Sequence, residues 1–77
     1  MKVKISHAAM MARLRRALAK EEQAIHRSRS GSIEAELGEF YVVHTRLNSV
    51  VAQHVDPESW AREIGAVKPF EIVLPAP

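Results

Sequence analysis

The side chains best suited to bind a ligand in this sequence are basic ones that recur at helical spacing. Arg13, Arg16 and Lys20 are three and four residues apart, so a helix would carry them along one side. A row of cationic groups of this kind neutralises phosphates, with an affinity that falls steeply as salt rises. The same row fits the solvated side of a helix whose opposite side packs on a core. The candidate nucleic-acid contacts are the basic residues in and shortly after this segment: Arg13, Arg15, Arg16, Lys20, Arg27 and Arg29.

Histidine, serine and glycine lack the grouping that metal binding or catalysis requires. His44 and His54 can share one face of a strand pair, but no carboxylate lies between them there, and a metal site needs converging ligands. Ser59 has no glycine-flanked nucleophile turn around it, and the three glycines are isolated, so no phosphate-binding loop is indicated. Without cysteine there is neither a disulfide nor a thiolate metal site. The sequence predicts a non-enzymatic protein with no catalytic residue, no metal, no cofactor and no small-molecule substrate.

Charge is unevenly divided along the 77 residues. Residues 1–29 carry eight basic and two acidic side chains, whereas residues 30–77 carry three basic and seven acidic ones, for a net charge of +2. Such an asymmetry indicates contact with nucleic acid. It also fits two halves that neutralise each other, within one molecule or across a dimer.

A long N-terminal helix is the element that must carry the basic row. Ser6 is suited to cap it, no Pro or Gly interrupts it, and it is predicted to run to about Gln23. Its apolar side is formed by residues at three- and four-residue spacing: Met10, Met11, Leu14, Ala17 and Leu18. Residues 24–29 then lose the helical period and fit a strand or an extended exit from the helix. Residues 33–38 fit either a short helix ended by glycine or a compact loop.

A β-hairpin is predicted over residues 39–55, EFYVVHTRLNSVVAQHV. Phe, Tyr and Val dominate two runs, and residues 46–48 between them include Asn48, which tolerates the left-handed conformation of hairpin turns. A three-residue turn pairs the strands in this register: Thr45 with Ser49, Val43 with Val51, and Tyr41 with Gln53.

Both faces of this hairpin are apolar, which a half-buried hairpin does not need. One face carries Phe40, Val42, Val50 and Ala52 with His44 and His54, and we expect the two helices to cover it. The other face must be covered by residues 72–74 of the tail or by another molecule. The predicted dimer interface is formed by apolar residues of this second face: Tyr41, Val43, Val51 and Val55.

A short C-terminal helix is predicted at about residues 57–64. Asp56 is a strong N-cap, and Pro57 suits the first helical position because its φ is fixed. Trp60 and Ile64 are four residues apart and are expected to anchor the helix together. The glycine at position 65 is placed to end the helix in a left-handed conformation.

The sequence thus predicts one small α+β domain over residues 1–77, with the segment 70–77 extended or flexible. The two helices pack on one face of a small antiparallel sheet, which is built on the hairpin at about 39–55 with residues 24–29 as a third strand. A domain of this size buries only about 60% of the surface of its unfolded chain, so its stability is marginal. Since disulfides are excluded, self-association is the simplest supplement, and we expect a homodimer.

The stretches HVDPESWAREIG and VKPFE follow the predicted hairpin. In this arrangement residues 39–71 resemble small proteins without an assigned activity that are encoded in proteobacterial genomes, often on plasmids and integrative elements. The resemblance covers under half of the chain and implies no functional residue. It implies an accessory or regulatory role rather than a metabolic one.

The partner predictions follow from these patterns. The apolar run at residues 5–12 contains Ser6 and His7 and is followed by arginines, so no signal peptide is indicated, and no stretch approaches the about 18 apolar residues of a membrane span. A cytoplasmic protein without membrane contact is expected. The leading functional prediction is a homodimeric protein–protein interaction module. The alternative is a nucleic-acid-associated accessory factor that uses the basic side of the N-terminal helix.

Overall fold

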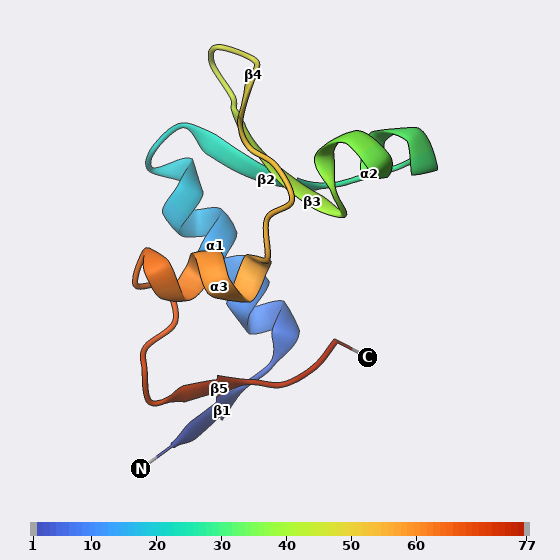
Figure 1. The fold of residues 1–77 in the computed structure, drawn as a ribbon. Coiled ribbons are helices and arrows are strands. Elements are labelled where there is room, and N and C mark those ends of the chain that lie inside the picture. The colour runs from blue at the N-terminus through green and yellow to red at the C-terminus, as the bar shows by residue number, and fades with distance from the viewer. Residues whose placement is uncertain (1, 77) are drawn as a thin grey trace.

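The computed structural model describes residues 2–76 and confirms the predicted α+β class (Figure 1). The elements follow in this order: β1 (Val3–Ile5), α1 (His7–Ala19), β2 (Gln23–Arg27), α2 (Gly31–Leu37), β3 (Phe40–His44), β4 (Ser49–Ala52), α3 (Pro57–Glu63) and β5 (Glu71–Val73). Strands β2, β3 and β4 form an antiparallel sheet in that spatial order, and β1 and β5 form a separate parallel pair. Helices α1 and α3 lie between the two sheets (Figure 1).

Helix α1 begins at the predicted cap and ends earlier than predicted. The Ser6 hydroxyl accepts a hydrogen bond from the Ala9 amide at 3.0 Å, as expected for an N-cap. The helix ends at Ala19 rather than at about Gln23, because the chain turns into β2 at Glu22, whose φ is 57°. Its buried side is the predicted apolar stripe, with Ala17 half-buried beside four buried residues: Met10, Met11, Leu14 and Leu18.

The third strand predicted at residues 24–29 is confirmed as β2, which pairs antiparallel with β3. Ile25 lies opposite Val42, and both side chains join the core cluster with α1. Cross-strand partners share a face of a sheet. The face turned away from the core, called the outer face below, carries these pairs: Ala24 with Val43, His26 with Tyr41, and Val43 with Val50.

The hairpin is confirmed, but its predicted register is wrong by one residue next to the turn, where His44 pairs with Ser49 and Val43 pairs with Val50. Farther from the turn Val42 pairs with Ala52, as the predicted register requires. A β-bulge lies between Val42 and Val43, so Val51 is the extra residue of β4. Val50 therefore lies on the outer face and not, as predicted, on the core face with Val42.

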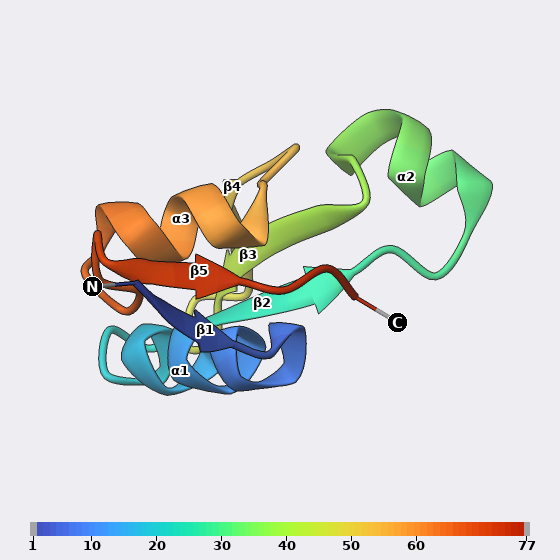
Figure 2. The same cartoon turned by 90° about the horizontal axis from the view of Figure 1, so that it is seen from below.

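The C-terminal tail forms β5, a strand that the sequence pattern did not predict. Its residues pair with β1 in parallel: Glu71 with Val3, Ile72 with Lys4, and Val73 with Ile5. Seen from below, this pair covers the seam between α1 and α3 (Figure 2). Val73 packs against the core cluster. The tail therefore lies on the helix side of the molecule and does not cover the outer face of the three-stranded sheet.

Helix α3 starts as predicted but buries a different residue. Asp56 has the extended backbone of an N-cap, and Pro57 occupies the first turn. Ala61 is fully buried, whereas Ile64 is 45% exposed, so the prediction that Ile64 anchors the helix was wrong. The buried side lies one turn earlier because the helix ends at Glu63, and Trp60 is half-buried against the core.

The segment between β2 and β3 takes the helical form of the two that the sequence allows. The Ser30 hydroxyl caps α2 by accepting a hydrogen bond from the Ile33 amide at 3.3 Å. The helix is followed by Gly38, whose φ of 83° is a conformation that favours glycine. No residue of α2 is buried, so the helix extends from the end of the sheet (Figure 1).

Candidate functional site

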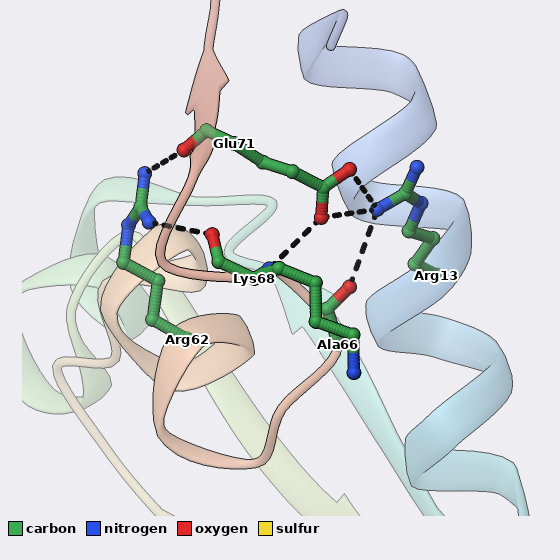
Figure 3. A network of polar contacts seen from close by, with 5 residues as sticks. All are labelled: Arg13, Arg62, Ala66, Lys68 and Glu71. Atoms are coloured by element: carbon green, nitrogen blue, oxygen red, sulfur yellow. Dashed lines mark hydrogen bonds and ion pairs between the residues drawn. The ribbon is translucent and has the colours of Figure 1, made fainter. Parts of the chain in front are cut away.

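The first predicted phosphate contact, Arg13, belongs to a structural ion pair instead (Figure 3). Its Nη1 donates to both carboxylate oxygens of Glu71 at 2.8 Å and reaches the carbonyl oxygen of Ala66 at 3.5 Å. The Glu71 residue is only 6% exposed. The pair ties the middle of α1 to β5, and it engages the Nη1 group of an Arg13 side chain that is 38% exposed.

The polar network around Glu71 also holds the end of the loop before β5 (Figure 3). The Lys68 amide donates to Glu71 Oε1 at 2.8 Å. Arg62 donates to the Glu71 carbonyl oxygen at 2.9 Å and to the Lys68 carbonyl oxygen at 3.3 Å. The hydrogen bond from the Lys68 amide, followed by that from Arg13, holds the pKa of the Glu71 carboxyl below its ordinary value of 4.5.

This lowered pKa predicts a loss of stability in acid. The folded protein holds the Glu71 proton less tightly than the unfolded chain, so the ionised carboxylate stabilises the fold above the ordinary pKa of 4.5. That contribution declines below pH 4.5 and is lost as the pH falls through the lower, folded pKa. Urea unfolding between neutral pH and about pH 3 measures the decline.

A Glu71→Gln variant is expected to be less stable at neutral pH and to show a smaller decline in acid than the unchanged protein. Glu36→Gln is the matched control, since Glu36 lies exposed on α2. Equal pH profiles for the Glu71→Gln variant and the unchanged protein would refute this role of Glu71.

The other predicted basic contacts lie in two separate groups. Arg15, Arg16 and Lys20 are exposed at the C-terminal half of α1, and no ion pair within residues 2–76 engages them. Arg27 forms an ion pair with Glu39 at 3.5 Å and, like the N-terminal end of α1, lines an open cleft. Arg29 follows it. Arg15 and Arg16 lie about two helical turns along α1 from the end that lines this cleft with Arg27, so the two groups lie in different parts of the molecule.

The cleft beside Arg27 has a volume of about 690 Å³. Met10, Phe40 and Val55 supply apolar lining, and ionisable groups of both signs surround them.

Within residues 2–76 no group of three or more potential metal-ligating side chains lies close enough together to hold an ion. Ser59, on the first turn of α3, donates its hydroxyl to Asp56 Oδ2 at 2.7 Å.

The four predicted dimer residues lie in different environments: two are half-buried, one is exposed and one is buried. Tyr41 and Val43 lie half-buried on the outer face, where the Tyr41 ring stacks on His26 with a centroid distance of 5.7 Å. Val51 is 45% exposed at the bulge. Val55 is only 9% exposed and belongs to the core, so its assignment to the dimer interface was wrong. The alternation of the strand does not reach Val55, because His54 has a φ of 55° and breaks it.

The hairpin carries two exposed apolar residues that the sequence analysis did not assign to an interface. Leu47 is 65% exposed in the turn and Val50 is 48% exposed on β4. Together with Val51 they form a surface called the hairpin patch below. The consecutive valines at 50 and 51 signal apolar character on both sides of the strand, but only the bulge decides which of them shares a face with Val43.

Comparison with protein-family models, with curated proteins and with solved structures gives no match. Among residues 2–76, no helix combines the length and the apolar character that crossing a bilayer requires.

Proposed function

We propose that this protein is a non-enzymatic protein–protein interaction module that works as a homodimer in an accessory or regulatory role. The observation that carries the proposal is the exposed hairpin patch of Leu47, Val50 and Val51. The tail is the segment of the chain that could have covered the outer face, and it is paired with β1 on the helix side. A second molecule is then what remains to cover this apolar surface.

The size of the exposed surface supports the same proposal. A compact monomer of 8.6 kDa exposes about 4,700 Å² by the usual scaling with mass. This chain exposes 5406 Å², about 700 Å² more, and one partner of a standard interface buries about 800 Å². Its radius of gyration of 12.9 Å also exceeds the about 11.5 Å expected for a chain of this length. The elongated shape is typical of a subunit that completes its packing by association.

Light scattering over a dilution series tests the homodimer. We expect the double substitution Val50→Thr/Val51→Thr to weaken dimerisation about two hundredfold. Each exchange removes about 0.8 kcal/mol of apolar burial, and a symmetric dimer contains four of them. Val3→Thr is the matched control, because Val3 is a strand valine with a similar exposed fraction, 43%, on the two-stranded sheet. Equal dimerisation constants for the two variants would contradict the role of the hairpin patch.

A second candidate function is supported by the exposed Arg15, Arg16 and Lys20 of α1, which no ion pair within residues 2–76 engages. A nucleic-acid-associated accessory factor would use them for phosphate contacts. Three such contacts on duplex DNA predict that the logarithm of the binding constant falls with the logarithm of salt with a slope of about −2.7.

Titration with duplex and single-stranded nucleic acid at two salt concentrations tests this candidate. We expect Arg15→Gln/Arg16→Gln to abolish most of the binding, whereas Arg46→Gln, which removes a cation already paired with Glu22 at 3.2 Å, leaves it unchanged. An absence of binding at low salt would exclude the candidate. The cysteine-free chain has no need of an oxidising compartment, and we propose the cytoplasm as the site of either function.

A further inference from the structure

We propose that two copies of this chain join antiparallel through the free edges of their β4 strands, which turns two three-stranded sheets into one continuous sheet of six strands. This inference rests on the homodimer proposed above and specifies how the two copies meet.

The free edge of β4 is the structural basis of the inference. In the sheet order β2-β3-β4, β4 pairs with β3 on one side, and no strand of residues 2–76 pairs with its other side. An edge strand presents unpaired N–H and C=O groups that accept another strand. Protein edges are usually guarded by lysine, by proline, by bulges, by short strands or by covering elements. Ser49–Ala52 is short and contains the bulge at Val51, but it has neither lysine nor proline, and the hairpin projects away from the helices (Figure 1).

The charge of the surroundings identifies a second copy as the occupant. A symmetric contact places the same residues of two molecules side by side, so a charged edge would repel itself. Residues 47–53 contain no Asp, Glu, Lys, Arg or His. The opposite edge of the sheet, at β2, carries exposed His26 and Arg27, and the exposed side of α1 carries Arg15 and Arg16. The β4 edge is the edge of this sheet that can meet its own copy without placing like charges together.

The most exposed apolar residues of the hairpin lie next to the free edge of β4. Tyr41 is already stacked on His26, and both Tyr41 and Val43 are half-buried. The apolar surface of the hairpin is largest at its turn and along β4, where Leu47, Val50 and Val51 are 65%, 48% and 45% exposed. Side chains alternate between the faces of a strand. Edge pairing consequently extends the apolar surface of both copies across one shared sheet. Antiparallel pairing about a twofold axis uses the β4 edge of each copy, so neither β4 edge stays open to further chains.

Single-cysteine variants of the full chain test the inference without background, because the chain contains no cysteine. Ser49→Cys, Val50→Cys and Val51→Cys are oxidised at equal concentration, and disulfide-linked dimer is measured on a non-reducing gel. Directly opposed residues in non-hydrogen-bonded pairs of antiparallel strands have Cβ atoms about 4.5 Å apart, which is within reach of a disulfide. We expect at least one β4 variant to cross-link tenfold faster than the control Ser32→Cys, whose residue is exposed on α2.

Amide hydrogen exchange of the unchanged protein provides a second measurement that needs no substitution. Exchange in β4 is expected to be about tenfold slower at a concentration that favours the dimer than after dilution, because the edge amides gain hydrogen-bond partners. The amides of α2 serve as the internal control. A dimer by light scattering with neither enhanced β4 cross-linking nor added β4 protection would overturn edge pairing while the homodimer stands. A monomer would overturn both.

Discussion

Replacing Leu14 by alanine is expected to lower the free energy of unfolding by about 2–5 kcal/mol. Leu14 is 0% exposed in the middle of α1 and belongs to the core cluster with Val42 and Val67. The substitution removes its contacts and leaves a cavity that the surrounding helices and sheet fill only in part. A domain of this length has a total stability of about 4–12 kcal/mol, so the loss is a large fraction of the total and the variant is expected to unfold at a much lower urea concentration.

Urea unfolding followed by far-ultraviolet circular dichroism measures this loss. Leu74→Ala is the matched control, because Leu74 is 41% exposed at the end of β5 and its truncation leaves no buried cavity. We expect the control to lose less than about 1 kcal/mol. Equal losses for the two variants would show that the core is not centred on α1 as described.

Replacing Gly38 by alanine is expected to cost more stability than its small size suggests. Gly38 has a φ of 83° and a ψ of 179°, a conformation that only glycine adopts readily, so alanine there costs about 1–3 kcal/mol. An added Cβ would also lie 2.7 Å from the Cα of His54. This contact is held in place because the His54 amide donates to the Leu37 carbonyl oxygen at 2.7 Å. The backbone after β4 must therefore move, and the loss is expected to exceed the conformational cost alone.

Gly65 provides a control for the loss of a glycine at positive φ without a close steric contact. Its φ of 81° is nearly the same, but a Cβ added there meets no atom within 4 Å. Gly65→Ala is therefore expected to lose only the about 1–2 kcal/mol of the left-handed conformation. If urea unfolding gives the same loss for both variants, the close approach of Gly38 to His54 does not stabilise the fold.

Elements with strong local signals were predictable from the sequence. The Ser6 cap marks the start of α1, and the fixed φ of Pro57 marks the start of α3, because both act within one helical turn. The Asp56 side chain makes no capping hydrogen bond, although its backbone has the extended conformation of an N-cap. The β-branched and aromatic runs of β3 and β4 mark the hairpin for a similar reason. These signals need no knowledge of the rest of the chain.

Features that depend on distant contacts were not predictable. The pairing of β1 with β5 joins the two ends of the chain through strands of three residues each, which are too short to show a period. The bulge at Val51 shifts the hairpin register, and nothing in two consecutive valines indicates it. Ile64 was assigned to the core from its spacing with Trp60, but tertiary packing selected the smaller Ala61 instead.

The candidate sites also depend on contacts between residues far apart in the sequence, which local patterns do not indicate. Arg13 has the spacing of a phosphate contact, and its actual partner, Glu71, lies 58 residues away in the sequence. Glu71 itself follows an apolar turn and carries no signal of burial, because a buried carboxylate is stabilised only by the donors that the fold gathers around it. The two apolar faces of the hairpin correctly indicated that apolar surface would be exposed there. That this surface lies at Leu47 and Val50 could be found only from the observed strand pairing.

Sedimentation equilibrium of the unchanged chain at micromolar concentration is the decisive measurement for self-association through the hairpin patch. We expect a mass of twice 8.6 kDa that falls toward the monomer mass on dilution. A mass of 8.6 kDa at every concentration would show that the hairpin patch does not join two copies.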